Sequence, residues 1–343
     1  MKGSETVLII GGGPAGMEAA LKAGAAGLQV VLVEKEKETG GLLNTLQGSF
    51  PDWADPSEVL RKKKAQIESN PNIAVRTGTI VASAERRGSG FVCRLEPGGQ
   101  LIDAGAVIIA SGFGLFDCSR YGEYGYGIYP GVLTSLEFEA RLKSWKGGER
   151  QNVPEAVGFI QCVGSRDRSK GHPWCSKICC MYTAKQAGMF RDLFPESRCY
   201  VFYIDIRAAG QSYEEFIRKV IEEKKVRYFR GRPGKVLPSG GRLLVRSEDT
   251  LMGVPIEVET DMVVLAPAVV PGPETGTLLE MLGASPDPCG FPQPREESRP
   301  HELAEGVFMA GGCSFALSVQ EAISQGAAAA AEALSYTRQK SAD

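Results

Sequence analysis

The sequence is poor in several features that mark common classes of protein. Histidine occurs only twice in 343 residues, as His172 and His301, which leaves little material for histidine-based acid–base or metal chemistry. No apolar run approaches the ~18–20 residues that span a bilayer. The N-terminus leads straight into a strand and a glycine turn, with no room for a signal peptide. Structural disulfides are rare in the cytoplasm, and an odd count of nine cysteines agrees with such a location. We therefore expect a cytoplasmic protein without a transmembrane segment.

An excess of charge of either sign is also missing. The chain has 39 Lys and Arg against 41 Asp and Glu, a net charge of −2. No nucleic acid or anionic membrane surface is therefore expected as a partner. The length suffices for two domains, each with its own core. Glycine is abundant, with 42 residues, and is well above the average usage of roughly 7%. This abundance suits glycine-rich nucleotide-binding turns.

The first 35 residues have the pattern of a dinucleotide-binding unit. The stretch "TVLIIGGGPAGMEAALKAGAAGLQVVLVEKE" reads as strand, turn, helix and strand, with Gly11, Gly13 and Gly16 spaced as G-x-G-x-x-G. Such glycines permit a tight turn, a close approach of a pyrophosphate and close packing of helix on strand. The helix N-terminus supplies free N–H groups for phosphate oxygens. Glu34 ends the second strand, where a carboxylate accepts hydrogen bonds from a ribose 2′-OH.

The sequence that follows Glu34 favours FAD over NAD as the bound dinucleotide. The chain resembles flavoproteins of the two-dinucleotide-domain class, which carry a Gly-Gly after the acidic strand end, as in "ETGGLL". The segments "AVIIASGFG" and "EGVFMAGGCS", the latter followed by an alanine-rich helix, resemble the second and third FAD segments of that class. The positive end of this helix would stabilise reduced, anionic flavin. The chain has Gly312 and Cys313 where the class usually has an Asp. The residues expected to bind FAD lie in these segments and beside them: Gly11, Gly13, Pro14, Ala15, Gly16, Glu34, Lys35, Gly40, Gly41, Leu42, Ile80, Val81, Ala110, Ser111, Gly112, Gly311, Gly312 and Val319.

The middle of the chain predicts a second, smaller α/β unit. The FAD-type segments end near residue 117 and resume near 270, and between them strand and helix patterns alternate. We expect a discontinuous FAD domain, 1–150 with 271–343, and an inserted domain, 151–270. In NAD(P)H-dependent relatives the second domain carries its own G-x-G-x-x-G. Here that position reads "QCVGSRDR", so a phosphate cradle is not expected.

The inserted domain concentrates four thiols, Cys162, Cys175, Cys179 and Cys180, in the spacing C-x12-C-x3-C-C. Zinc normally takes two C-x2–4-C knuckles, and only one such pair is present. Four thiolates from a strand end, a loop and a helix start are able to surround an iron–sulfur cubane. Nearby cations, Arg166, Lys170 and Lys177, would offset its charge. A redox disulfide and chemically inert thiols remain open as alternatives.

Three segments of the chain resemble those of a known family. "GFIQCVGSRD…WCSKICCMYTAKQA", "FYIDIRA" and "YGEYGYGIYPGVLTSLEFE" are similar to the flavin-carrying A subunit of heterodisulfide reductase. The resemblance implies a thioredoxin-reductase-like two-domain flavoprotein of the α/β class, with a [4Fe–4S] cluster held by the quartet beside FAD. The short form, without further cluster domains, resembles the flavin-carrying component of the heterodisulfide-reductase-like complex of sulfur-oxidising bacteria.

The resemblance also implies a function. The chain would be an electron-transfer subunit that converts between two-electron and one-electron steps, as a homodimer within a larger complex whose other subunits carry the sulfur chemistry. The family suggests Lys185 near the flavin N5 edge, with Glu137 as its carboxylate partner. Three alternatives stand beside this interpretation: a free-standing NAD(P)H-dependent disulfide reductase that uses Cys175 and Cys179, the flavin subunit of a quinone-interacting oxidoreductase, and a scaffold that keeps FAD for structure only.

Overall fold

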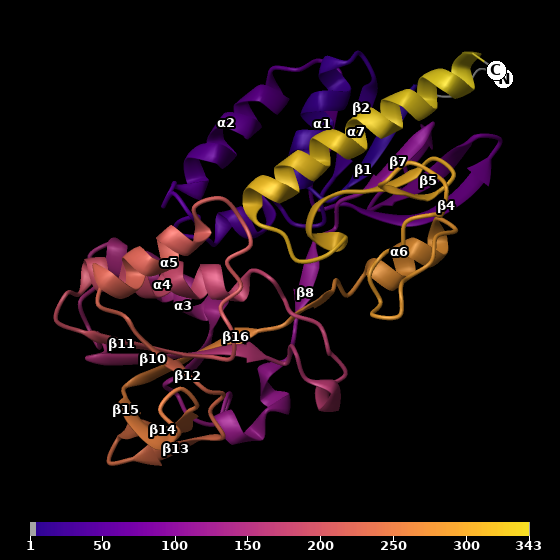
Figure 1. The fold of residues 1–343 in the computed structure, drawn as a ribbon. Helices are drawn as coiled ribbons and strands as arrows, with labels where there is room; N and C mark the ends of the chain where they lie inside the picture. The colour runs from indigo at the N-terminus through magenta and orange to yellow at the C-terminus, as the bar shows by residue number, and fades with distance from the viewer. Residues whose placement is uncertain (1–4, 343) are drawn as a thin grey trace. The chain divides into compact units, whose positions relative to one another are not determined.

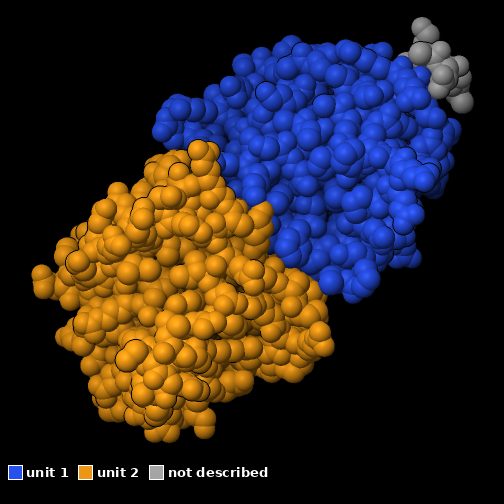
Figure 2. Space-filling model, viewed as in Figure 1, with its two compact units in different colours: residues 1–44, 56–114, 270–343 blue, residues 45–55, 115–269 orange. Residues whose placement is uncertain are grey.

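The computed structural model describes residues 5–342, and the chain divides into two compact units. Unit 1 comprises residues 1–44, 56–114 and 270–343, and unit 2 comprises 45–55 and 115–269 (Figure 2). The chain crosses between them at residues 44–45, 55–56, 114–115 and 269–270; the short strands β8 (Phe113–Leu115) and β17 (Val269–Pro271) lie at the last two of these crossings. No helix among residues 5–342 is both long enough and apolar enough to cross a membrane.

Unit 1 is built on a six-stranded sheet that is parallel except at one edge, where β18 runs antiparallel to β19. The strand order is β18 (Glu302–Ala304), β19 (Val307–Met309), β7 (Ala106–Ile109), β1 (Thr6–Ile10), β2 (Gln29–Val33) and β3 (Ile73–Arg76). A three-stranded antiparallel sheet is added by β4 (Ile80–Arg87), β5 (Gly90–Glu96) and β6 (Leu101–Ala104). The helices are α1 (Pro14–Ala25), α2 (Pro56–Glu68), α6 (Thr275–Met281) and α7 (Val319–Ala342).

Strand β1 is buried on both faces, and its side chains divide between two apolar cores. Val7 and Ile9 pack with residues of α1, α2 and α7, which lie together over one face of the sheet (Figure 1). Leu8 and Ile10 pack with the β4–β6 sheet and α6 on the other face. Such burial on both faces explains why this strand is a continuous apolar run rather than an alternating one.

Helices α1 and α7 approach each other closely because glycine lies at their contact. A Cβ atom on Gly326 of α7 would stand 2.2 Å from the Ala15 carbonyl oxygen of α1, and one on Gly16 would stand 1.9 Å from the Gly11 carbonyl oxygen. Real side chains do not tolerate such distances. The two glycines therefore fix how closely α7 approaches α1 and how closely α1 approaches the turn after β1.

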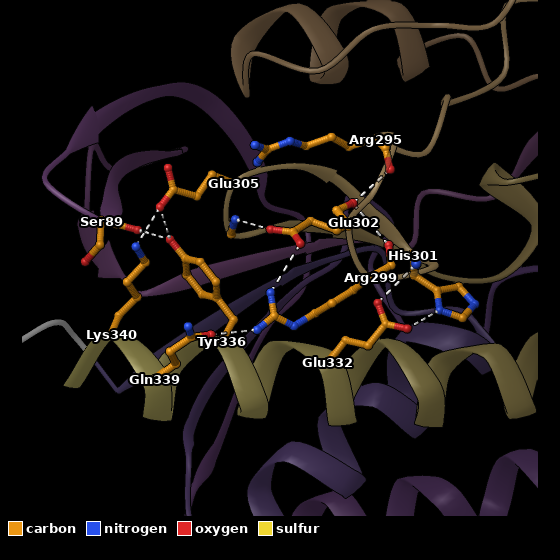
Figure 3. A network of polar contacts seen from close by, with 12 residues as sticks. Ser89, Arg295, Arg299, His301, Glu302, Glu305, Glu332, Tyr336, Gln339 and Lys340 are labelled. Atoms are coloured by element: carbon orange, nitrogen blue, oxygen red, sulfur yellow. Dashed lines mark hydrogen bonds and ion pairs between the residues drawn. The ribbon is translucent and has the colours of Figure 1, made fainter. Parts of the chain in front are cut away.

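A polar network holds α7 to the segment that precedes β19 and to the turn between β4 and β5 (Figure 3). Glu332 of α7 accepts a hydrogen bond from the His301 backbone N–H at 3.0 Å and pairs with the His301 ring at 2.7 Å. One turn later, Tyr336 donates to the Ser89 carbonyl at 2.7 Å. Lys340 pairs with Glu305 at 2.9 Å. These contacts lie on successive turns, so they set the rotation of the helix.

Unit 2 is built on a five-stranded parallel sheet with a separate antiparallel hairpin sheet. The parallel order is β12 (Arg227–Arg230), β11 (Arg198–Tyr203), β10 (Ala156–Val163), β16 (Met262–Pro267) and β9 (Val132–Thr134). The antiparallel sheet is β13 (Lys235–Ser239), β14 (Arg242–Asp249) and β15 (Val254–Thr260). The helices are α3 (Ser135–Lys146), α4 (Cys179–Leu193) and α5 (Tyr213–Glu222).

Unit 2 takes in residues 115–269, where the sequence analysis places an inserted domain at 151–270. Strand β9 pairs with β16 of the second sheet, from Val132 opposite Val263 onward. Phe138 of α3 packs in the core of unit 2. Residues 45–55 also join this unit, because Trp53 packs against Phe216 with ring centroids 4.5 Å apart. Both segments carry apolar side chains that only unit 2 buries, which local sequence patterns do not reveal.

The α1–α7 contact gives a direct test of the fold. We expect Gly326→Ala to lower the free energy of unfolding by about 1–3 kcal/mol, because the added methyl group forces the helices apart. Gly276→Ala in α6 is the matched control, since a Cβ there meets no atom within 4 Å. That variant should be neutral or stabilising by about 0.5–1 kcal/mol. Chemical denaturation of both variants would measure the difference, and equal stabilities would contradict the packing.

Candidate functional site

The turn after β1 forms a cradle whose inner side is bare of side chains. Gly11, with φ of 112°, donates its N–H to the Val33 carbonyl at 2.8 Å. A Cβ on it would stand 2.3 Å from the Ala110 carbonyl oxygen. Gly13 caps α1 without a side-chain hydrogen bond, and a Cβ there would meet no protein atom within 4 Å. The helix start therefore faces space that a ligand phosphate is able to enter.

Glu34 is buried at the end of β2 and closes the cradle on one side. Its carboxylate accepts hydrogen bonds from the backbone N–H of Gly12 at 2.7 Å and of Glu36 at 2.9 Å. A carboxylate has about four lone-pair positions, so acceptor capacity remains for a ribose hydroxyl. Gly40 donates to the Gly12 carbonyl at 2.8 Å, and a Cβ on Gly41 would stand 3.2 Å from Gly13 Cα. The structure thus brings the predicted Gly-Gly pair against the predicted glycine turn.

The second and third predicted segments reach the same cradle. Ala110 follows β7, and its N–H donates to the Ile10 carbonyl at 2.8 Å. A Cβ on Gly311, after β19, would stand 2.4 Å from the Ala15 Cβ. The Ser111 hydroxyl is buried without a hydrogen-bond partner among the described residues. A buried hydroxyl of this kind is costly unless a ligand satisfies it. Its place beside the glycine turn agrees with a bound dinucleotide.

Some residues near the predicted FAD segments make other contacts in the structure, or lie on the surface or in the apolar core. Lys35 pairs with Glu274 at 2.6 Å on the surface, Ile80 is exposed, and Val81 is part of the apolar core. Cys313 is buried, and its thiol donates to the Ile109 carbonyl at 3.1 Å. Burial raises its pKa to about 11, so it fills space and is not a reactive thiol.

The remaining residues predicted to bind FAD lie at the starts of helices or just after strands. Pro14 takes the first helical position of α1, where its missing N–H costs nothing. Leu42 lies in a short 3-10 turn, Gly41–Asn44. Val319 begins α7 behind a reciprocal cap, in which Glu321 N–H donates to the Ser318 hydroxyl and Ser318 N–H donates to the Glu321 carboxylate. Gly112, with φ of 77°, and Gly312, whose added Cβ would stand 2.6 Å from the Phe113 ring, follow β7 and β19.

In unit 2, three of the four predicted thiols come together at the carboxyl end of β10. Cys162 lies near the strand end with φ of 60°, while Cys179 and Cys180 open helix α4. All three are buried in one small apolar cluster with Ala266. Cys175 lies in the intervening loop and interacts with Cys162 and Cys180 electrostatically. The sequence spacing thus translates into proximity because a parallel strand and the following helix meet at the carboxyl edge of the sheet.

The three buried thiols change one another's pKa values. Cys179 is within hydrogen-bonding reach of Cys162 and Cys180, and this contact raises its own pKa well above the ordinary value. The same contact, aided by the charge of Arg166, lowers the pKa of Cys162 to about 7. Hydrogen bonding from Cys179 also lowers the pKa of Cys180. Burial raises the pKa of Cys175. Deprotonation is therefore favoured at Cys162 and Cys180 rather than across the whole group, and the thiolate is the form that soft metals prefer.

Backbone and side-chain donors surround the sulfur atoms. Lys177 N–H donates to Cys175 Sγ at 3.3 Å, and Arg207 N–H donates to Cys180 Sγ at 3.4 Å. Arg166 Nη1 and Gln161 Nε2 are buried without a hydrogen-bond partner among the described residues. Over residues 5–342, however, no group of three or more His, Cys, Asp or Glu side chains is arranged so that it could hold a metal ion.

The loop between Cys162 and Cys175 is held by polar contacts among Tyr121, Asp167, Lys170 and Arg232, called the polar lock below. The Asp167 carboxylate accepts hydrogen bonds from the Tyr121 hydroxyl and from Arg232, the latter at 3.0 Å. Lys170 lies over the Tyr121 ring at 4.4 Å, so its charge is committed to this lock rather than to the thiol group. Local sequence patterns carry no signal for the lock, because its members come from segments far apart in the chain.

Lys185 is paired with a different carboxylate from the one expected. Its ammonium bonds to Glu139, and both side chains are almost fully buried. Burial lowers the pKa of Lys185, and the Glu139 charge opposes that shift. Glu137 instead caps α3, where it accepts from the Thr134 backbone N–H at 2.7 Å. The expectation for Glu137 as the partner is wrong because residues two apart on a helix point to opposite sides. The burial of Lys185 also excludes the alternative that it is a solvated lysine on the helix surface.

Comparisons with known proteins agree with this architecture. A family model described as pyridine nucleotide-disulphide oxidoreductase matches residues 5–142. Among solved structures, thioredoxin reductase of T. acidophilum covers 96% of this chain and 97% of its own, with a TM-score of 0.67 and 19% identity. Thioredoxin reductase of Lactococcus lactis covers 97% and 99%, with a TM-score of 0.65 and 19% identity. These likenesses confirm the predicted thioredoxin-reductase-like fold.

Curated relatives give the family. One of the iron-sulfur A subunits of CoB–CoM heterodisulfide reductase from Methanopyrus kandleri is 30% identical over 96% of this chain and 64% of its own length. The corresponding A subunit from Methanocaldococcus jannaschii is 32% identical over 84% of this chain and 57% of its own. The chain thus spans about three-fifths of the length of these relatives. Together with the fold and the thiol group, these matches show that the chain belongs to the family of heterodisulfide reductase A subunits.

Proposed function

We propose that this chain is a flavin- and [4Fe–4S]-carrying electron-transfer subunit of a heterodisulfide-reductase-like complex that acts in sulfane sulfur or disulfide metabolism. The observation that carries the proposal is the burial of Cys162, Cys179 and Cys180 in one small cluster, with Cys175 in the loop beside it. When bound, FAD and the cluster together supply conversion between two-electron and one-electron transfer.

The residues of unit 1 fit FAD. The bare space at Gly13, the buried acceptor Glu34 and the unsatisfied hydroxyl of Ser111 are the features that a dinucleotide would use. When FAD is bound, the start of α1 would hold the pyrophosphate, Glu34 would orient a ribose, and the Gly40–Gly41 pair would leave room for the chain of the cofactor.

Several features of unit 2 support the proposed iron–sulfur cluster. Four thiols form the donor set of [4Fe–4S] clusters, and the Arg166 guanidinium compensates the negative charge of thiolates. Two N–H groups already donate to sulfur, and the buried donors of Gln161 and Arg166 without partners among the described residues are available for further bonds. Hydrogen bonds to sulfur tune the potential of such centres.

Two finer points belong to the same proposal. All nine cysteines are free, which supports a reducing compartment such as the cytoplasm. The expected homodimer, the place of Lys185 near the flavin and the role of partner subunits in sulfur chemistry follow from the family resemblance and stay predictions.

A free-standing disulfide reductase that uses Cys175 and Cys179 is less well supported. The thiols in hydrogen-bonding contact are Cys162, Cys179 and Cys180, which is not the pair that such a reductase needs. Bleaching of the flavin by NADPH, with two thiols appearing per chain, would favour that reductase instead.

Flavin binding is tested by Gly13→Ala. Its backbone φ of −72° suits alanine, and an added Cβ meets no protein atom within 4 Å. The apoprotein should therefore keep its unfolding midpoint. Because the methyl group occupies the phosphate space, FAD affinity should fall at least about tenfold, a loss of about 1.4 kcal/mol. Flavin fluorescence titration measures this, with Gly276→Ala as control. Unchanged affinity would contradict the placement of FAD.

Cluster binding is tested by Cys179→Ala, with Cys199→Ala as control. Both thiols are buried to the same extent, at 1% exposure, but Cys199 packs in the apolar core away from the thiol group. After anaerobic reconstitution we expect about four irons per chain in the native protein and in the control. Cys179→Ala should hold much less iron while flavin content stays the same. Equal iron in the two variants would remove Cys179 from the ligand set.

A further inference from the structure

Among the four predicted ligand thiols, Cys175 is the one that no helix or strand carries. Cys162 lies near the end of β10, and Cys179 and Cys180 open α4, whereas Cys175 lies in the loop between these elements and is half-buried. Its Sγ accepts a hydrogen bond from the Lys177 N–H at 3.3 Å. The place of this sulfur relative to the other three therefore depends on how the loop is held.

The loop folds into a short hairpin that ends just before Cys175. The Arg166 N–H donates to the Trp174 carbonyl at 2.8 Å. Beside this pair, Asp167 and His172 exchange both backbone hydrogen bonds, at 2.9 Å and 3.1 Å. Because Cys175 directly follows Trp174, a displacement of the hairpin at Asp167 would also displace the thiol.

The residues on either side of Cys175 are both attached to Val269. The Trp174 ring N–H donates to the Val269 carbonyl at 3.1 Å, and the Ser176 hydroxyl accepts from the Val269 N–H at 2.9 Å. These contacts hold the end of the loop that leads into α4. The hairpin on the other side of Cys175 is attached to the rest of unit 2 through the polar lock.

Asp167 is the acceptor at the centre of the polar lock, and both of its carboxylate oxygens are used. One oxygen accepts hydrogen bonds from the Tyr121 hydroxyl and from Arg232, the latter at 3.0 Å. The other accepts from the Ser169 N–H and hydroxyl, at 2.9 Å and 2.6 Å. The Asp167 side chain is only 15% exposed. Because hydrogen bonds to an ionised acceptor are strong, this carboxylate ties the hairpin to two loops that are distant in sequence.

We propose that Asp167 is a positioning residue that holds Cys175 beside the three buried thiols and so secures the fourth ligand of the cluster. The second half of this inference rests on the proposed cluster. Without the carboxylate charge the hairpin is held less firmly, and Cys175 leaves the thiol group for a larger part of the time. Metal centres lose their metal more readily when a residue that orients a ligand is removed.

The first test measures alkylation of Cys175 by iodoacetamide in the iron-free full chain under anaerobic conditions, with the labelled residues identified by mass spectrometry. Asp167→Asn keeps the shape of the side chain and removes its charge. Its Cys175 should react at least about tenfold faster than in the native protein, because weaker hydrogen bonds favour local opening. Cys199 is 1% exposed and should stay unlabelled, which reports that unit 2 remains folded.

Asp261→Asn is the matched control. The Asp261 carboxylate also receives several donors within unit 2, since the Ala156 N–H and Arg242 donate to it, each at 2.8 Å. Ala156 begins β10, so these contacts lie at the opposite end of the strand from Cys162. Substitution of Asp261 should therefore change the alkylation rate of Cys175 less than about twofold.

Equal rates in the native protein and Asp167→Asn, or equal increases in Asp167→Asn and Asp261→Asn, would overturn the positioning role. If Asp167→Asn does not fold, Tyr121→Phe answers the same question, because it removes one donor to the same carboxylate and keeps the ring. An alkylation rate in Tyr121→Phe equal to the native rate would then overturn the role.

The second test measures how fast reconstituted protein loses iron to a chelator. Asp167→Asn should lose iron about tenfold faster than the native protein. In a Cys175→Ser background the same substitution should change the rate less than about twofold, because no thiol is left for it to position. Equal effects in the two backgrounds would mean that Asp167 does not act through Cys175. If Cys175→Ser holds no iron, the alkylation rates decide.

The two measurements separate the role of Asp167 from the presence of the cluster. If the native chain binds no iron but Cys175 reacts faster in Asp167→Asn than in the control, the cluster assignment fails and the hold of Asp167 on Cys175 stands. If the chain holds iron and Asp167→Asn changes neither rate, the positioning role fails and the cluster stands.

Discussion

The hydrogen-bonded contact of Cys179 with Cys162 and Cys180 is the interaction on which the functional account depends. It exists because β10 delivers Cys162 to the carboxyl edge of a parallel sheet, where α4 begins with the adjacent pair. Burial alone would favour neutral thiols. A hydrogen bond with Cys179, together with the Arg166 charge, lowers the pKa of Cys162 instead. The fold thereby favours the anionic form of the Cys162 sulfur in apolar surroundings.

The same architectural rule operates in unit 1. Strands β1, β2, β7 and β19 end beside one another. The residues within two positions of these strand ends, Gly11, Glu34, Ala110 and Gly311, meet around the start of α1. Several positions around this site are glycines, and the lack of a side chain has two effects. Gly16 and Gly326 let backbones approach closely, whereas Gly13 leaves space that no protein atom fills.

Much of this arrangement is predictable from sequence, because it depends on local patterns. The glycine turn, Glu34 and the Gly-Gly pair have fixed offsets along one βαβ unit, and the structure places them together. The C-x12-C-x3-C-C spacing likewise combines a strand end with a helix start. Both are short-range rules with a physical basis.

Other features depend on which side chains meet across the fold, and the sequence carries no local signal for them. Trp53 packs against Phe216 from a segment that looks like part of the first domain. Asp167 receives Tyr121 and Arg232 from distant loops. The choice between Glu137 and Glu139 for Lys185 depends on the rotation of α3 relative to α4. Family resemblance points to the lysine but not to its partner.

We have proposed that one chain carries both a [4Fe–4S] cluster and a flavin and passes electrons between them. Low-temperature electron paramagnetic resonance of anaerobically prepared, half-reduced protein tests it most directly. The account predicts one reduced-cluster signal per chain and a flavin radical that relaxes faster than in iron-free protein. A flavin radical with the same relaxation in both preparations, or iron without a cluster signal, would contradict it.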